Sequence, residues 1–461
     1  MENKPVNGNM NDENATLGMG ERIGYGIGDF ANNMMYAPVA SFVTYFMTNV
    51  AGLGAGVVGT IMLLSRLLDG FSDLTIGVLM EKVKSPKGKA RPWLLWWCVP
   101  FAVSLVLMFT APDFGMTGKI IYAFLSYNLA TTVVYTAINL PFGSLATLMT
   151  KNQRERGYLN ISKMVFAFAG AFVVNMLTLP LVKYFGNTAR AWQITFVIYG
   201  AIATVIFLIV YFSTKERVVD QSEANGQKLD IKEAIKSMLH NKYWLIMLCV
   251  FFVNHFGQAL IGVNVYYAQY VMRDTGLVGS ISLFQTIASF VTFGACTFLI
   301  RRFGKQRIIL GGAVISIVGY ALVILAPENY MMLYATSFIK GAGNAAISGV
   351  MYGMLADTVE YNEWKSGIRA EGLVFSANSI GIKIGTGLGV AVLGWVLAAF
   401  GYVSSSDVQP QMAINGIRII FLYVPVVVYS VLAFVVTRYK LDKEYDGIIA
   451  DLVERKARNN K

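Results

Sequence analysis

The sequence predicts an all-α membrane protein with twelve transmembrane helices, arranged as two pseudo-symmetric six-helix bundles. Three observations support this fold class. Hydrophobic residues make up 55% of the 461 residues and charged residues only 14%, whereas an ordinary globular domain has about 25% charged residues. Apolar runs of roughly 20 residues, the length of a membrane-spanning helix, recur along the chain. The longest polar stretch inside the chain divides these runs six and six.

Each apolar run is expected to be helical, because lipid offers no partner for unpaired backbone groups. Several runs are longer than the bilayer requires, which indicates tilted helices or ends that protrude into water. The predicted spans are 24–49, 54–81, 93–112, 119–149, 162–182, 192–213, 243–272, 278–300, 308–326, 331–356, 372–401 and 416–437.

The distribution of basic residues predicts the orientation of these spans. If the N-terminus is cytoplasmic, the loops on that side carry clusters at 82–91, 151–156 and 301–307, whereas the opposite loops carry only isolated Lys and Arg. This asymmetry follows the positive-inside rule. It predicts a multi-pass protein of the cell (inner) membrane with both termini in the cytoplasm. The net charge of +11 therefore indicates an anionic membrane face and not a nucleic-acid partner.

Five segments follow from this topology. They are a cytoplasmic N-terminal tail (1–23), an N-terminal six-helix bundle (24–213), a cytoplasmic linker (214–242), a C-terminal six-helix bundle (243–437) and a cytoplasmic tail (438–461).

Two of the cytoplasmic segments contain apolar residues at helical spacing. Residues 229–240 of the linker are predicted to form a short amphipathic helix. In the tail, Ile448, Ile449, Leu452 and Val453 have a spacing that fits either a surface helix or a solvated tail.

A short internal repeat supports the division into halves. The sequence GKAR (88–91) precedes the third span, and GKQR (304–307) precedes the ninth. Equivalent places in the two halves make a chance match less attractive. Two six-helix halves joined by a central linker resemble the architecture of the major facilitator superfamily.

Few ionisable side chains lie within the predicted spans. Each costs about 2.5 to 3.5 kcal/mol at the centre of a membrane helix, so they are expected to line a polar cavity and to offset one another. They are Asp29, Arg66, Asp69, Asp73, Lys163, Lys340 and Lys383.

Three of these charges lie on one face of the second span. Arg66, Asp69 and Asp73 are separated by one and two helical turns. Two carboxylates one turn apart in a low dielectric cannot both stay ionised without a proton or a bound cation. Hard carboxylate oxygens suit Na⁺, and the same pair can instead take a proton. The alternative is a structural ion pair in which Arg66 bridges both carboxylates.

The segment RLLDGFSDLTIG (66–77), followed by GKARPW (88–93), resembles the signature of the glycoside-pentoside-hexuronide:cation symporters, the melibiose permease family of the major facilitator superfamily. The resemblance extends from Glu21 to about Tyr402. Further matches are YGIGDF (25–30), YTAINLPFGSL (135–145), RER (154–156), DTVEYNEWKSGIR (357–369) and Lys383.

The resemblance implies a role for each matching residue. A coupling cation, which is a metal ion if it is Na⁺, would bind Asp69 and Asp73, helped by Ser72 and Thr136, with Arg66 as the charge partner. A cytoplasmic gate would comprise Asp357, Glu360 and Arg369, a solvated loop being the alternative. The sugar would contact Asp29, Tyr36, Tyr135, Asn139, Lys163, Asn378 and Lys383.

The chain departs from the family pattern at three sugar-site positions. Asn139 replaces a second aspartate, Gly143 replaces a tryptophan, and Lys163 replaces an arginine, whose bidentate contact lysine cannot make. These changes put galactoside selectivity in doubt. The loss of one negative charge makes an anionic sugar less disfavoured, and a xyloside or glucoside remains equally open.

The resemblance implies a secondary active transporter and not an enzyme: a sugar:cation symporter that works by alternating access. It is expected to act as a monomer among membrane lipids and to need no cofactor except its coupling cation, Na⁺ or H⁺. A lysolipid-type cation-coupled carrier and a sugar sensor that does not transport are the alternatives. No GxxxxGK[ST] motif occurs, which argues against ATP-driven transport.

Two polar residues in the second half keep two interpretations each. Lys340 either contacts an anionic substrate or pairs within the C-terminal half. His255 is either functional, as a proton relay or a substrate contact, or, more simply, a satisfied polar lining residue. The three cysteines lack the spacing of a disulfide framework or a zinc site.

Overall fold

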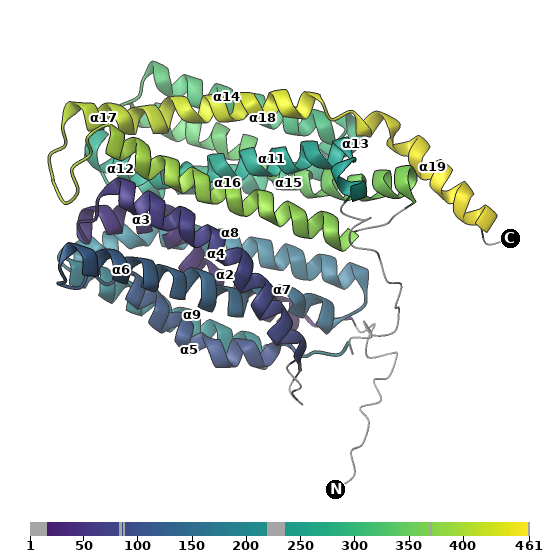
Figure 1. Cartoon of the computed structure of the whole chain (residues 1–461), viewed down its shortest axis with the longest axis horizontal. Coiled ribbons are helices and arrows are strands. Elements are labelled where there is room, and N and C mark those ends of the chain that lie inside the picture. Colours follow the sequence, from purple (N-terminus) through teal and green to yellow (C-terminus); the bar gives the residue numbers. More distant parts are fainter. Residues whose placement is uncertain (1–15, 83–84, 86–87, 219–235, 368–370, 460–461) are drawn as a thin grey trace, which may run out of the picture. The chain divides into compact units, whose positions relative to one another are not determined.

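The computed structural model describes residues 16–82, 85, 88–218, 236–367 and 371–459. Every regular element in these residues is a helix, which agrees with the predicted class (Figure 1). Arg369 and most of the predicted amphipathic helix at 229–240 lie outside the described residues.

The chain divides into two compact units. The first comprises Met1–Gly226 and the short segment Ser404–Ser406, and the second comprises Gln227–Val403 and Asp407–Lys461. The division between Gly226 and Gln227 falls inside the linker expected at 214–242.

Six consecutive helical segments occur in the part of the first unit that the structure describes. Its first and fourth segments each change from α- to π-helix along their length, and the other four are continuous. The elements are α2 (Met19–Ser41), α3 (Val43–Tyr45) and η1 (Phe46–Val50); α4 (Ala55–Lys82); α5 (Arg91–Met108); α6 (Met116–Asn128), η2 (Leu129–Val134) and α7 (Tyr135–Met149); α8 (Gln153–Tyr184); and α9 (Ala189–Ser213).

Within the described residues, the second unit contains a short helical stretch at 236–239, six further segments and a C-terminal helix. The elements are α11 (Lys242–Ala259), η3 (Leu260–Gly262), α12 (Val263–Tyr266) and η4 (Tyr267–Val271); α13 (Leu277–Phe303); α14 (Lys305–Leu325); α15 (Tyr330–Ser366); α16 (Glu371–Ala399); α17 (Gln411–Arg418), η5 (Ile419–Tyr423) and α18 (Val424–Thr437); and α19 (Leu441–Asn459).

Ten helices in the described part of the chain are long and apolar enough to cross a membrane. The predicted first and tenth spans are helical as well, but they carry more polar side chains, such as Asn32 in α2 and Lys340 in α15, both buried. Neighbouring helices shield them: α2 packs on α8 and α9, and α15 packs on α13 and α14. Protein packing therefore explains why these two helices are less apolar.

Helix packing repeats between the two units. In the first unit the first span (α2) packs on the fifth (α8) and sixth (α9), and the third (α5) packs on the sixth. In the second unit α11 packs on α16 and α18, and α14 packs on α18. The same pairs therefore recur six spans later, which extends the short sequence repeat to the whole of each unit.

The GKAR motif forms a cap at the start of α5. The Glu216 carboxylate, which follows α9, accepts hydrogen bonds from the backbone N–H groups of Lys89, Ala90 and Arg91 at 2.7, 3.0 and 2.8 Å. Gly88 has φ +107°, and a Cβ there would lie 2.4 Å from this carboxylate. Glycine is therefore required for both conformation and space, and the anion satisfies a positive helix end.

The GKQR motif repeats this cap at the start of α14. The Asp442 carboxylate accepts a hydrogen bond from the backbone N–H of Gln306 at 2.7 Å, and Gly304 has φ +79°. In both units a carboxylate that follows the sixth span thus closes onto the start of the third.

The C-terminal segment forms a helix that packs on the second unit. Ile448 and Leu452 of α19 are buried in its hydrophobic core. The indole Nε1 of Trp364 donates to Asp451 at 2.6 Å, whereas Val453 is exposed. This packing favours the surface helix over the solvated tail.

Candidate cation and substrate site

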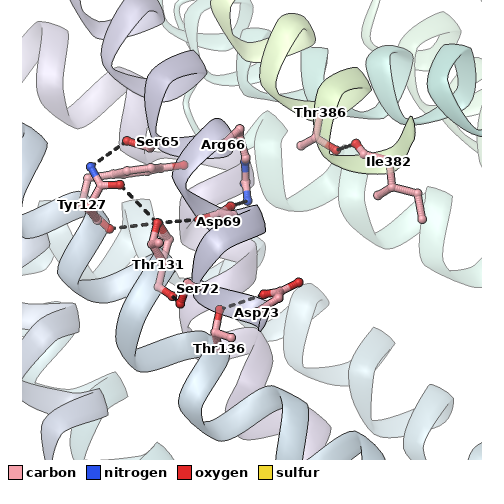
Figure 2. Close-up of polar contacts among 12 residues, drawn as sticks. Ser65, Arg66, Asp69, Ser72, Asp73, Tyr127, Thr131, Thr136, Ile382 and Thr386 are labelled. Carbon is pink, nitrogen blue, oxygen red and sulfur yellow. Dashed lines mark hydrogen bonds and ion pairs between the residues drawn. The ribbon is translucent and has the colours of Figure 1, made fainter. Parts of the chain in front are cut away.

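Arg66 and Asp69 form an ion pair in α4. Arg66 Nη1 lies 2.9 Å from Asp69 Oδ2, and the two side chains are 19% and 8% exposed. The close-up in Figure 2 shows the guanidinium reaching one turn along the helix to the carboxylate. Asp69 is the more deeply buried member of the pair, and the role of Arg66 as charge partner of a cation site stays a prediction.

The other oxygen of Asp69 contacts the fourth span. Thr132 Oγ1 donates to Asp69 Oδ1 at 2.5 Å. Thr132 belongs to the π-helical segment η2, which packs against α4. The family resemblance implies a hydroxyl role for Thr136 and does not indicate Thr132.

A ladder of polar contacts joins α4 to the fourth span (Figure 2). Asn128 donates to Ser65 Oγ at 2.8 Å, Thr132 donates to Asp69, and Thr136 Oγ1 lies 3.4 Å from Asp73 Oδ1. Residues four apart share one face of a helix. This i, i+4 spacing is present in both segments and is the signal that could have identified Ser65, Asn128 and Thr132.

Ser72 contacts this ladder through the backbone. Its hydroxyl donates to the carbonyl oxygen of Thr132, so it anchors α4 to η2.

The site thus gathers carboxylate, hydroxyl and carbonyl oxygens. No group of three or more His, Cys, Asp or Glu side chains that could hold a metal occurs in the described residues. An oxygen set of this kind suits a hard cation such as Na⁺ and does not suit a thiophilic metal.

A cavity of about 500 Å³ lies in the same unit. It contains two of the predicted sugar-contacting residues, Asn139 and Lys163, together with Gly143. A Cβ at Gly143 would meet no atom within 4 Å, so the position where the family pattern has a tryptophan is open space. The complete lining is Gly77, Met80, Asn139, Leu140, Gly143, Ser144 and Lys163. Pockets of about 300 to 1,000 Å³ are typical of small-molecule sites.

Tyrosine rings and charged groups occur beside this region. The rings of Tyr36 and Tyr135 stack with centroids 6.4 Å apart, and Tyr36 is 48% exposed. The amide of Asn32 donates to Asp29 Oδ1 at 3.2 Å, and Asp29 interacts electrostatically with Lys163. Exposed aromatic faces and paired charges are groups that can bind a sugar.

The remaining predicted sugar-contacting residues belong to the second unit. Asn378 and Lys383 both lie in α16. Asn378 is 2% exposed, and its side-chain oxygen has no hydrogen-bond partner among the described residues.

Of the predicted cytoplasmic gate, the structure places Asp357 in an ion pair that the sequence had not indicated. Lys305 Nζ lies 2.6 and 2.7 Å from the two carboxylate oxygens of Asp357. Lys305 is the lysine of the GKQR motif, and Glu360 follows Asp357 in α15. Because Arg369 lies outside the described residues, the three-residue gate stays a prediction.

The family model described as MFS/sugar transport protein matches residues 24–443. The chain belongs to this family. It is therefore a multi-pass membrane protein of the major facilitator superfamily, a family of transporters and not of enzymes, as predicted.

Individual relatives agree with this assignment. An isoprimeverose transporter of Lactiplantibacillus pentosus is 34% identical over 95% of this chain and 92% of its own. A putative glycoside/cation symporter of Escherichia coli K12, YagG, is 32% identical over 96% of each chain. The crystal structure of a bacterial homolog of the human lysosomal transporter Spinster has a TM-score of 0.65 at 14% identity, over 93% of this chain and 97% of that one. This last likeness concerns the fold alone.

Lys340, in α15, lies beside two aromatic rings. Its Nζ lies 4.8 Å from the ring centroid of Tyr320 and 5.1 Å from that of Phe421. The residue is 4% exposed and forms no ion pair in the described part of the chain. Cation–π contacts, rather than a carboxylate, thus surround this lysine.

His255 is a hydrogen-bonded lining residue. Its Nδ1 lies 2.8 Å from the carbonyl oxygen of Phe251, one turn earlier in α11, and the two rings stack. This local contact agrees with the simpler of the two interpretations.

Proposed function

We propose that this protein is a secondary active transporter that carries a glycoside, pentoside or hexuronide together with a cation by alternating access. The observation that carries the proposal is the position of Asp69. It is a buried carboxylate in a membrane-spanning helix, bonded to Arg66 and Thr132, in the same unit as the pocket of Asn139 and Lys163. The names of the isoprimeverose and glycoside/cation relatives support the same substrate class.

Coupling follows from electrostatics in this proposal. A carboxylate inside a membrane protein is costly unless a cation compensates it. A cation that binds Asp69 and Asp73 reduces the negative charge of the unit that also holds the substrate pocket. If the cation strengthens sugar binding, the sugar must strengthen cation binding by the same factor. The coupling cation is Na⁺ or H⁺.

The residues that line the pocket favour a substrate other than the galactoside that the family pattern implies. The amide of Asn139 adds no negative charge, and Lys163 supplies a positive one. The open position at Gly143 enlarges the space beside them. We therefore propose a substrate that is either anionic, such as a glucuronide, or neutral, such as a xyloside or glucoside.

The remaining assignments belong to the same proposal. Both termini lie in the cytoplasm, the protein resides in the inner membrane, and the monomer is the transporting species. The basic loops support this orientation.

Sugar uptake into membrane vesicles tests the proposal. The membrane potential of the vesicles is set to be positive inside in one series and negative inside in the other. A panel of radiolabelled glycosides, pentosides and uronides is presented with an imposed Na⁺ gradient or an imposed proton gradient. We expect accumulation above equilibrium for at least one sugar with one of the two gradients. Equilibration of every sugar without accumulation, under both gradients, contradicts symport.

A further inference from the structure

The hydroxyl of Thr132 has two acceptors and one proton. Asp69 Oδ1 lies at 2.5 Å and Asn128 Oδ1 at 3.2 Å. A threonine hydroxyl can donate one hydrogen bond and accept two. The shorter contact takes the proton, so Thr132 donates to Asp69.

The second acceptor has a fixed orientation. Both N–H groups of the Asn128 amide are used, one by Ser65 Oγ at 2.8 Å and one by the Phe124 carbonyl at 2.7 Å. Ser65 cannot reverse this contact, because its own proton is donated to the Ile61 carbonyl at 2.8 Å. The amide oxygen of Asn128 therefore faces Thr132 as a standing acceptor.

The backbone of η2 holds Thr132 in this place. In this π-helical turn the N–H of Tyr135 bonds to the Ala130 carbonyl, five residues earlier. Wide turns of this kind are often found at functional sites. The Thr132 carbonyl in the same turn receives the Ser72 hydroxyl. In transporters, backbone carbonyls at places where a membrane helix departs from regular geometry can coordinate Na⁺.

We propose that Thr132 is a cation ligand and Asn128 its positioning residue, linked by a hydroxyl switch. When the site is empty, Thr132 donates its proton to Asp69. When Na⁺ binds at Asp69, the proton turns to Asn128 Oδ1 and the Thr132 oxygen faces the ion. No bond to hydrogen is broken in this rotation. The inference rests on the proposed cation symport and names the cation as Na⁺.

The neighbouring residue Thr131 provides a control for Thr132. Thr131 is equally buried, at 8% against 6% exposure, but its hydroxyl donates to the Tyr127 carbonyl of its own helix at 2.9 Å. Thr131→Val is thus a matched control for Thr132→Val, because each removes one buried hydroxyl from the same turn. Thr132→Ser keeps the hydroxyl and serves as the conservative rescue.

Two measurements test the proposal. The first is the Na⁺ concentration that half-saturates sugar uptake in vesicles, and the second is the rise in melting temperature of the purified protein in NaCl relative to choline chloride. We expect Thr132→Val to raise the half-saturating concentration by about tenfold or more and to remove most of the Na⁺ stabilisation. Thr132→Ser and Thr131→Val should stay within about threefold of the wild type.

Asn128→Leu separates the switch from simple packing. It removes the second acceptor and the two hydrogen bonds that the amide donates, but leaves the Thr132–Asp69 contact. The melting temperature in choline chloride should therefore fall. Na⁺ affinity should also fall several-fold, and because the Na⁺ stabilisation is measured relative to choline chloride in the same variant, the packing loss cancels from it. Unaltered Na⁺ dependence in Thr132→Val overturns the proposal. If wild-type vesicles respond to a proton gradient and not to Na⁺, symport stands and the switch fails. If they respond to neither, symport itself fails and the switch with it.

Discussion

The Arg66–Asp69 pair can be tested by removing its charges one at a time and together. Asp69→Asn keeps the shape of the side chain and an acceptor for Thr132, but leaves Arg66 without its partner at 2.9 Å. Breaking a buried ion pair in this way costs about 3 to 5 kcal/mol, whereas removing both charges is often close to neutral. The Asp69→Asn variant should therefore be strongly destabilised. The double variant, which combines Arg66→Gln with Asp69→Asn, should regain most of the lost stability.

The melting temperature of the purified protein measures this cost. A unit of this length loses roughly 2 to 4 °C per kcal/mol, so Asp69→Asn should melt about 6 to 20 °C below the wild type. Sugar accumulation is measured in parallel. The double variant should be stable and still fail to accumulate sugar, because the carboxylate that binds the cation is absent.

A second ion pair of the same unit provides the control. Arg22 and Glu155 lie 2.9 Å apart, and the Glu155 side chain is 4% exposed. Glu155→Gln should lower the melting temperature and leave the cation dependence of residual uptake unchanged. A double variant at Arg66 and Asp69 that accumulates sugar at the wild-type level would refute a cation role for Asp69. A wild-type melting temperature in Asp69→Asn would refute the energetic argument.

Three further predictions concern separate features. Asp73→Cys should abolish cation-driven accumulation of sugar while sugar exchange persists, because the carboxylate that lies 3.4 Å from Thr136 Oγ1 is lost. Gly143→Trp, which restores the residue of the family pattern, should occupy part of the cavity of about 500 Å³ and narrow the range of sugars taken up, without loss of folded protein; Gly143→Ala should transport normally. Glu216→Ala should destabilise the first unit by about 1 to 2 kcal/mol, because three backbone N–H groups lose their acceptor.

Each of these predictions has a clear contrary outcome. Cation-driven accumulation in Asp73→Cys would place the cation elsewhere. Normal uptake of all sugars by Gly143→Trp would show that the cavity is not on the substrate path. A wild-type melting temperature for Glu216→Ala would mean that water replaces the carboxylate without cost.

The fold was predictable because its signals are local. Length and hydropathy identify each apolar helix, and the polar stretch at 214–242 separates the halves. Helices α2 and α15 were also predicted as spans, although their buried polar side chains lower their hydropathy. The ends of α15 were less predictable, since this helix runs to Ser366, beyond the expected end at 356, where the chain is no longer apolar.

The candidate site was predictable only in part. The spacing of Asp69 and Asp73 along one helix is visible in the sequence, whereas the partner of each depends on which helices pack together. The π-helical turn around Thr132 cannot be read from its residues, because Thr and Val are compatible with several backbone conformations. The sequence shows Lys305 as the lysine of the GKQR repeat. Its ion pair with Asp357 is not visible there, because the pair depends on packing between α14 and α15.

The carboxylate of Glu216 has a consequence for biosynthesis. It binds the start of α5 from a position just after the sixth span. This contact can form once residue 216 has left the ribosome, before the second unit is complete. Domains fold as units during synthesis, N-terminal first. The first six helices can therefore reach their final packing in the membrane while the ribosome is still translating the rest.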